Sequence, residues 1–361
     1  MKQAESIAHL RQLCCLGLDS EAVMPELLSG LRNLVPSSNS AFYWTDTRGS
    51  PQNVYQEYIL PSAIQLQMEA YHLFQGANEP SIEALTGGSL AVGNIRRIQT
   101  REYFQRSNTH NLVCKPHGHR YNLDGIVRDS GKPRGMLLLF REAGGRDFSA
   151  DDERMLNSLL PYFNHALIPA TVSNLQYVNA EDSGVVIADA GGRVLHLTRS
   201  AHRLLTYVMN PRLGPGAVWR QPETLLPESV QRLCRDLVRI QAGCEAPPPA
   251  ARIDNAWGRF SFHAQFLDAQ ALQGGTGAAC NIAIVIRREE PLTLRIMRRL
   301  KDSPLSVRQR EVALRLALGD DTLTLRRTLG ISAETLRDHV RKIYRRIEVH
   351  NRQQLISRLG S

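Results

Sequence analysis

Five cationic side chains in one ten-residue segment near the end of the chain have the clearest chemistry in the sequence. They are Arg337, Arg341, Lys342, Arg345 and Arg346, and the only acid among them is Asp338. A guanidinium group matches the O6 and N7 acceptors of guanine, a carboxylate can accept from cytosine N4, and any of the cations can contact phosphates. A charged helix face is usually only a solvated face, but this one-sided excess favours nucleic-acid binding.

The positive charge of the chain is concentrated in the same region. The whole chain carries 44 Lys and Arg against 35 Asp and Glu. Residues 292–361 carry 16 against 7, so residues 1–291 carry 28 of each and are neutral. A neutral body joined to a basic segment is typical of a nucleic-acid reader attached to another module. A disordered basic tail is the alternative, but helical apolar spacing and capping residues favour a folded domain.

Local signals predict four short helices in this basic region. Ser306 and Gln309 fit a capping box at the start of the first helix, and Gly319 ends it. A second helix is expected after three consecutive capping residues, with two leucines on its apolar side: Asp320, Asp321 and Thr322, then Leu325 and Leu329. Asn351 with Gln354 is expected to cap a short fourth helix.

The third helix follows a tight turn. Gly330 can take a positive φ there, and Ser332 caps the helix. Its expected inward stripe is Leu336, Val340, Ile343 and Ile347. Two helices joined by a glycine turn of this length predict a helix-turn-helix, whose second helix enters the major groove of DNA.

These residues together resemble the LuxR-type helix-turn-helix domain over residues 305–359. The motifs that carry the resemblance are Leu305-Ser306-x-Arg308-x-Arg310-Glu311-Val312, Gly319, Leu329-Gly330-Ile331-Ser332, Thr335-Leu336-Arg337-x-His339 and Ile343-Tyr344-Arg345-Arg346-Ile347. The resemblance implies a small all-α domain of four helices, with the third helix in the groove of double-stranded DNA. It also implies a dimer contact on the fourth helix, through Leu355, Ile356 and Leu359.

The resemblance also implies which side chains bind DNA. The expected base readers are Arg337, Asp338 and Arg341, the expected phosphate contacts are Lys342, Arg345 and Arg346, and Thr335 lies in the same interface. The second helix departs from the family in two places. Leu323 replaces a phosphate-binding lysine, and Arg326 replaces a small residue, so Arg326 must extend outward or widen the helix crossing. Arg326 and Arg327 can replace the lost phosphate contact.

The body of the chain shows two successive α+β patterns. In residues 1–170, helical and strand patterns alternate and end in a long helix capped by Ser149. The expected strands are 41–46, 54–58, 120–128 and 135–141, and the expected helices are 7–16, 23–34, 62–74 and 149–167. This order, with the phrase DSGKPRGMLLLFREAGGRDFSADD, resembles a GAF domain, which is a sensory module.

Residues 171–290 resemble a PAS-type fold, again by pattern. A hairpin around the Gly191-Gly192 turn precedes helices near 201–205 and 230–240. Strands at 257–267 and 282–286 then flank a loop at Gly274–Gly277. Residues 291–303 are expected to be a linker helix, either a rigid spacer or a signalling element, ahead of the helix-turn-helix domain at 304–361.

The body offers few candidates for chemistry. His110, Cys114, His117 and His119 are metal-ligand types in a tight cluster, but their spacing fits no standard site, so a polar loop is favoured over zinc or haem. The aromatic residues from Phe42 to Phe74 favour a core over a pocket, with Phe42 and Trp44 on the opposite face of a strand from Tyr43. A small apolar or aromatic effector inside such a sheet domain stays an open alternative.

Several classes of protein are disfavoured by the motifs that the chain lacks. It has no Walker loop, nucleophile elbow, His-Glu-x-x-His or dinucleotide fingerprint, so neither an enzyme nor a bound cofactor is predicted. The six cysteines lack CxxC spacing, which favours reduced thiols. No apolar run approaches the length of a membrane span, and no signal pattern opens the chain, so a soluble, cytoplasmic protein without a membrane partner is expected.

We therefore predict a homodimeric transcription regulator whose sensory domains modulate sequence-specific binding to double-stranded DNA by the C-terminal helix-turn-helix. A small-molecule effector and RNA polymerase are further candidate partners. The alternative is a regulator that acts through protein contacts, with a helix-turn-helix that no longer reads sequence. Leu323 and Arg326 motivate that alternative. An enzyme with a DNA-binding appendage has no residue that supports it.

Overall fold

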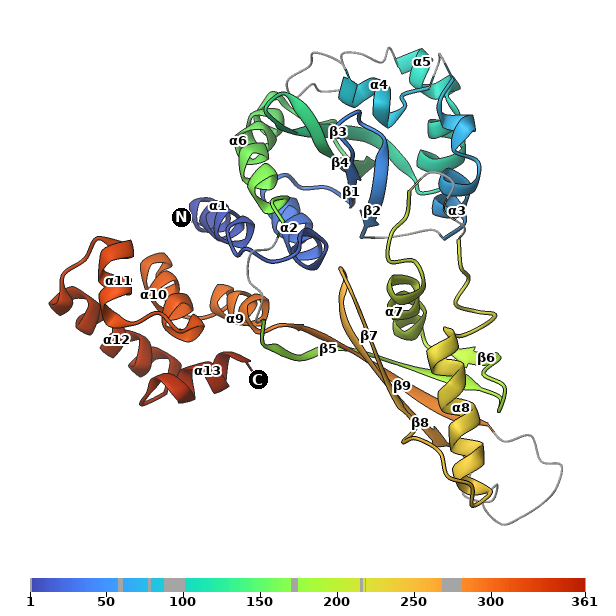
Figure 1. Ribbon diagram of the computed structural model, residues 1–361. Coiled ribbons are helices and arrows are strands. Elements are labelled where there is room, and N and C mark those ends of the chain that lie inside the picture. The colour runs from blue at the N-terminus through green and yellow to red at the C-terminus, as the bar shows by residue number, and fades with distance from the viewer. Residues whose placement is uncertain are drawn as a thin grey trace. The chain divides into compact units, whose positions relative to one another are not determined.

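The computed structural model describes residues 2–57, 61–76, 79–87, 101–169, 175–214, 217, 219–267 and 281–360 (Figure 1). These residues form two compact units. The first comprises Met1–Val172 with Arg212–Trp219, and the second comprises Ser173–Pro211 with Arg220–Ser361. The predicted mixed α+β region followed by an all-helical C-terminal region is confirmed. No helix in the described ranges is long and apolar enough to cross a membrane.

The first unit is built on a four-stranded antiparallel sheet with the strand order β2-β1-β4-β3. Helix α6 packs on β3, α2 packs on β1 and β2, and α1 packs on both helices. Its elements are α1 (Lys2–Cys14), α2 (Ser20–Leu34), β1 (Asn39–Thr45), β2 (Pro51–Gln56), α3 (Pro61–Glu69), the 3-10 helix η1 (Tyr71–Phe74), α4 (Ile82–Gly87), α5 (Arg101–Arg106), the π-helix η3 (Thr109–Cys114), β3 (His119–Asp129), β4 (Lys132–Glu142) and α6 (Ala150–Ala166).

Strand β1 separates two apolar layers of this unit. The Phe42 ring centroid lies 5.0 Å from that of Trp44 and 6.4 Å from that of Phe163 on α6. Tyr43 instead belongs to a buried cluster with residues of α3, α4 and η3, so the predicted division of these aromatic residues is confirmed. Gly135 on β4 permits the packing, because a Cβ there would lie 2.4 Å from the Phe42 ring.

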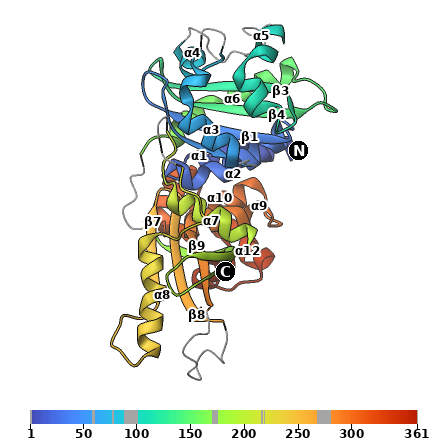
Figure 2. The same ribbon diagram turned by 90° about the vertical axis from the view of Figure 1, so that its right-hand side faces the viewer.

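The second unit joins a five-stranded antiparallel sheet, of order β6-β5-β9-β8-β7, to a C-terminal group of helices. Helix α8 runs along β7 and β8 (Figures 1 and 2). The elements are β5 (Tyr177–Ala188), β6 (Val194–Leu197), α7 (Arg199–Met209), α8 (Glu228–Gln241), β7 (Ala250–Asn255), β8 (Gly258–Phe266), β9 (Ile282–Pro291), α9 (Leu292–Lys301), α10 (Val307–Leu318), α11 (Thr322–Leu329), α12 (Ala333–Ile347) and α13 (Arg352–Gly360).

Strand β7 was not predicted from the sequence. It follows the three prolines at 247–249, and it is an edge strand whose residues alternate between exposed and half-buried. Its single large apolar residue is Ile253. Such a strand lacks the apolar alternation by which sequence patterns identify strands. The loop predicted at Gly274–Gly277 lies outside the described residues.

The segment Arg212–Trp219, which links α7 to α8 in sequence, is part of the first unit. Leu213 and Trp219 are buried in the same cluster as Tyr43. The Leu213 amide donates to the side-chain oxygen of Asn53, at 3.0 Å. Leu213 and Trp219, which follow α7 in the sequence, therefore belong to the core of the first unit.

Helix α9 is an integral part of the second unit. It starts directly after β9 and packs on β5 and β9 of the sheet. It also packs on the helices α10 and α13. Its buried residues are Leu294, Arg295, Ile296, Met297 and Leu300. The helix predicted between body and C-terminal domain is therefore present, and it contacts the sheet as well as the C-terminal helices.

A buried carboxylate fixes α9 to the end of β9. Glu290 is 4% exposed and Arg295 is 3% exposed, and the Arg295 Nε donates to Glu290 Oε1 at 2.6 Å. Arg298 donates to both oxygens of the same carboxylate, at 3.0 and 2.9 Å. Arg295 also donates to the carbonyl oxygen of Asn179 on β5. One carboxylate thus holds two arginines of α9 against the sheet.

Replacing Glu290 by Ala is expected to lower the free energy of unfolding by about 3–5 kcal/mol, because Arg295 would remain buried without its counter-charge. Urea denaturation followed by circular dichroism measures the change. Glu289→Gln is the matched control, because Glu289 contacts Arg252 and Arg259 only at 3.6 Å. Loose pairs near the surface contribute about 0–1 kcal/mol. Equal effects of the two substitutions would contradict the assignment.

Candidate nucleic-acid interface

The caps predicted from the sequence set the boundaries of the C-terminal helices. Ser306 and Gln309 form a capping box on α10, and Gly319 ends that helix with φ 111°. The Asp321 carboxylate accepts from the Thr324 amide at 2.7 Å and caps α11. That backbone hydrogen bond lowers the pKa of Asp321. The first two helices therefore begin and end where the chemistry of their terminal residues predicts.

The turn between α11 and α12 also has the predicted form. Gly330 adopts φ 60°, and Ser332 caps α12 by accepting from the Thr335 amide at 3.1 Å. The hydroxyl of Thr335 lies 2.9 Å from that of Ser332. Asn351 accepts from the Gln354 amide at 2.8 Å and caps α13. A helix-turn-helix with a fixed entry to its second helix is therefore present.

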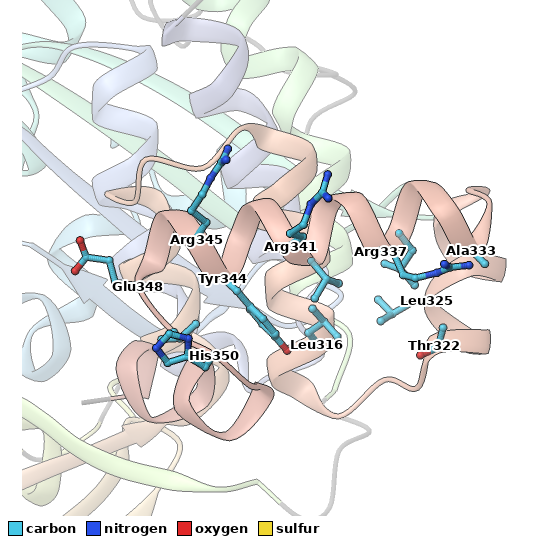
Figure 3. Close-up of a pocket in the computed structure, with 13 residues that line it drawn as sticks. Leu316, Thr322, Leu325, Ala333, Arg337, Arg341, Tyr344, Arg345, Glu348 and His350 are labelled. Carbon is cyan, nitrogen blue, oxygen red and sulfur yellow. The ribbon is translucent and has the colours of Figure 1, made fainter.

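The inward stripe of α12 is narrower than predicted. Leu336 and Ile343 are buried, whereas Val340 and Ile347 are only half-buried. Val340 and Tyr344 line an open groove together with residues of α10 and α11 (Figure 3). Helix α11 has 8 residues against 15 in α12, so it cannot cover the whole length of the longer helix.

Three arginines on α12 lie along this groove and project into solvent. Arg337, Arg341 and Arg345 are exposed and follow one another at intervals of one helical turn. Figure 3 shows Arg341 and Arg345 projecting to the same side of the helix, whereas Tyr344 points toward Leu316. In the described part of the chain, Arg337 and Arg345 make no hydrogen bond or ion pair. Their guanidinium groups are therefore available to a partner.

Asp338 lies beside these arginines and is paired. Its carboxylate accepts from Arg341 at 3.0 Å and lies 2.6 Å from the Lys342 Nζ. The hydrogen bond from Lys342 is the main cause that lowers the pKa of Asp338. The Arg341 side chain is 82% exposed, so the pair is a surface contact. The pair orients the Arg341 side chain. Because exposed ion pairs contribute little free energy, Arg341 can leave Asp338 and bind the edge of a DNA base at little cost.

Arg346 differs from the other cations of α12. Its guanidinium donates to the Gln309 side-chain oxygen at 2.7 Å and to the Pro304 carbonyl oxygen at 3.2 Å. Gln309 is buried and part of the α10 capping box. Arg346 therefore holds the start of α10 against the end of α12, a role that the predicted phosphate contact did not include.

The two residues of α11 that depart from the family pattern, Leu323 and Arg326, are both exposed. Arg326 and Arg327 are exposed, whereas Leu325 and Leu329 fill the interior. Arg326 therefore extends outward, which is one of the two outcomes expected for a large residue at this position. Leu323 also points to solvent, with 61% of its surface exposed. An apolar side chain thus stands on the surface of this helix.

The three residues predicted as a dimer contact are not equivalent. Leu355 is 0% exposed and Leu359 is 3% exposed, so both are buried within the single chain. Helix α13 packs on α9 and α10, which accounts for their burial. Ile356 alone of the three is half-exposed. The amphipathic pattern of a short helix does not distinguish packing within one chain from contact with a second chain. Here two of the three residues pack within the chain.

The four metal-ligand types at 110–119 do not converge. Cys114 is buried in the cluster around Tyr43, and burial raises the pKa of its thiol to about 12. His119 stacks on Phe140 at 4.1 Å, and burial lowers its pKa to about 4. Among the described residues, no group of three His, Cys, Asp or Glu side chains could hold a metal ion.

The geometry defines the C-terminal helices as a helix-turn-helix domain of the DNA-binding type. Residues 303–359 match the family described as bacterial regulatory proteins, luxR family, so this part of the chain is a LuxR-family domain. A stretch of 50 residues is 46% identical to YhjB of Escherichia coli (strain K12), whose name classes it as an HTH-type transcriptional regulator. The match covers 14% of this chain and 25% of that protein.

Solved structures give weaker likenesses. A Vibrio cholerae VqmA–ligand–DNA complex is 16% identical, with 50% of this chain and 86% of that chain covered and a TM-score of 0.20. The sensor region of a sensor histidine kinase is also 16% identical, with 70% of this chain and 84% of that chain covered and a TM-score of 0.18.

Replacing Arg337 by Ala is expected to weaken binding to the preferred DNA site by about 1–3 kcal/mol and to relax the preference at one base position. Arg345→Ala should weaken binding to all sequences alike and reduce the salt dependence by about one charge. Fluorescence anisotropy with specific and bulk DNA over a range of NaCl concentrations separates the two effects. An unchanged affinity of the Arg337→Ala variant for its best DNA site would rule out the assignment of Arg337 to the major groove of DNA.

Arg346→Ala is expected to act on folding. It removes two hydrogen bonds from a charged donor and leaves Gln309 less well paired, so the free energy of unfolding should fall by about 1–3 kcal/mol. The neighbouring exposed Arg345→Ala is the control and should change stability by no more than about 0.5 kcal/mol. Thermal denaturation of both variants tests this. A larger effect of Arg345→Ala would reverse the assignments.

Proposed function

We propose that the protein is a transcription regulator that reads a specific operator with α12. The observation that carries the proposal is the line of exposed Arg337, Arg341 and Arg345 on the second helix of the helix-turn-helix. Arg337 and Arg341 take the role of base readers, because arginine pairs bidentately with guanine. Asp338 accepts from cytosine N4 when DNA displaces one of its two cations. Lys342, Arg345, Arg326, Arg327 and the Thr335 hydroxyl contact phosphates.

The regulator acts as a dimer in this proposal. A single helix-turn-helix contacts only a few base pairs, so useful specificity requires two half-sites about one turn of DNA apart. Ile356 supports a contact on α13, because it is the apolar residue of the expected set that is still partly accessible in the single chain. A symmetric contact then places Ile356 near its counterpart.

The α+β body is proposed to be sensory, with a GAF-like first domain and a PAS-like second domain. The succession of hairpin, helices and returning strands in each sheet supports this reading. Helix α9 transmits the signal, since it touches β5 and β9 of the sheet and α10 and α13 of the DNA-binding domain. An effector that prefers one arrangement of the sheet changes DNA affinity by that preference, typically about 1–3 kcal/mol.

A second candidate is a regulator that works through protein contacts. Leu323 favours it, because a leucine that is 61% exposed on α11 suits a protein surface better than a phosphate. Selection of bound fragments from sheared genomic DNA, followed by comparison with bulk DNA, separates the two candidates. Sequence-specific regulation predicts enrichment of a common site and at least about 1000-fold tighter binding to it. Equal affinity for all fragments supports the protein-contact regulator.

Ile356→Glu is expected to weaken dimerisation on DNA, because a charge would enter an apolar symmetric contact. Sedimentation of the full chain with a two-half-site fragment should show loss of the two-chain complex, while unfolding is unaffected. Ser357→Glu is a neighbouring control. A two-chain complex that survives Ile356→Glu at the same affinity places the dimer contact elsewhere.

A further inference from the structure

The first unit contains a cavity of about 80 Å³ between the sheet and the segment from α3 to η3. Residues from β1, β3 and β4 form one wall, and residues from α3, η1, α4, α5 and η3 form the other. A water molecule takes up about 30 Å³ in the liquid, so the space corresponds to roughly two or three waters, and it is about half of the roughly 150 Å³ that takes a benzene ring. The cavity therefore accommodates a molecule of a few heavy atoms, smaller than an aromatic ring.

Most of the cavity wall is apolar. Met68, Phe74, Leu85, Phe104 and Met136 line it, and Tyr43 contributes its ring. The Tyr43 hydroxyl donates to the Gln67 side-chain oxygen at 3.0 Å, so this polar group is satisfied. Burial raises the pKa of Tyr43 to about 12, so the hydroxyl remains neutral. These walls suit a short, compact apolar body.

Asp124 is the exception in this wall. It lies on β3, is 2% exposed, and lines the cavity. Its Oδ2 accepts from the Asn122 side chain at 3.1 Å, whereas its Oδ1 is buried and has no hydrogen-bond partner in the described ranges. Burial raises the pKa of Asp124 to about 7. A buried carboxyl without a counter-charge destabilises the fold, so a partner that restores its hydrogen bond would bind strongly.

We propose that this cavity binds a short aliphatic amine, and that its ammonium group pairs with Asp124 Oδ1. An ammonium supplies both the donor and the charge that the buried carboxyl lacks, whereas a neutral donor supplies only the first. The apolar body fills the space between Met68, Leu85 and Phe104. No residue of the LuxR-family domain lines this site.

The same cluster offers a route by which occupancy affects the rest of the chain. Leu213 and Trp219 belong to it, and they lie on the segment that links α7 to α8. An amine that fills the cavity contacts Tyr43 and Met68, which pack in that cluster. The amine is therefore the effector of the regulator, an inference that rests on the function proposed above.

Calorimetric titration of the full chain with a panel of short alkylamines, led by ethylamine, tests the site. Ethanol is the neutral counterpart. Wild type should bind an amine of the panel at least about 10-fold more tightly than the matching alcohol, because a charged hydrogen bond is roughly twice as strong as a neutral one. No binding by any amine, or equal binding of amine and alcohol, overturns the proposal.

Asp124→Asn keeps the shape and the acceptor for Asn122, and it removes the charge. It should weaken amine binding at least about 10-fold and raise the melting temperature, because the unpaired carboxyl is lost. Asp129→Asn, an exposed residue of the same strand, is the control and should change neither. Amine binding that is undiminished in Asp124→Asn overturns the assignment, whatever the effect on stability.

Repeating the DNA titration with and without the amine tests separately whether the amine is the effector. A shift in DNA affinity that Asp124→Asn abolishes supports it. Amine binding without such a shift overturns the effector role and leaves the site. Failure of the chain to select a DNA sequence overturns the proposed function, yet calorimetry still decides whether the cavity takes an amine.

Discussion

The carboxylate of Glu290 is the contact on which the second unit depends. It is buried at the end of β9 and accepts hydrogen bonds from Arg295 and Arg298 of α9, which fixes the direction in which the helix leaves the strand. The other side of α9 then packs on α10 and α13. The sheet and the DNA-binding helices thereby share one helix. Because α9 contacts the sheet on one side and α10 and α13 on the other, we propose it as the element that couples them.

The positive charge of the C-terminal region divides into two functions. Arg295 and Arg298 bind the Glu290 carboxylate and hold α9 against the sheet, whereas Arg346 binds Gln309 and the Pro304 carbonyl oxygen and holds α12 against α10. Arg337 and Arg345 have no such partners in the described part of the chain, and Arg341 has only a surface pair with Asp338. The groups left available lie on one line of α12. The net charge of the region therefore indicates a nucleic-acid partner. The hydrogen bonds and ion pairs within the chain then show which arginines are available to bind it.

Local chemistry was predictable from the sequence, and long-range packing was not. Ser306, Gly330 and Ser332 act through neighbours three or four residues away, so their capping roles could be predicted. The burial of Leu355 and Leu359 depends on α9 and α10, and the pairing of Arg346 depends on Gln309, which is distant in sequence. The insertion of Arg212–Trp219 into the first unit, and the cavity at Asp124, arise from contacts between segments whose own patterns are unremarkable. Nothing in the sequence around Asp124 indicated that its carboxyl would be buried with one oxygen lacking a hydrogen-bond partner among the described residues.

Arginine-selective chemical modification with mass spectrometry, with and without an operator fragment, tests the central claim most directly. The free chain should react at Arg337, Arg341 and Arg345, which are exposed, and react slowly at Arg295, which is buried. DNA should protect the three α12 arginines and leave the reactivity of exposed arginines in the first unit, such as Arg106, unchanged. Equal modification of Arg337, Arg341 and Arg345 in the presence and absence of bound DNA would contradict the account.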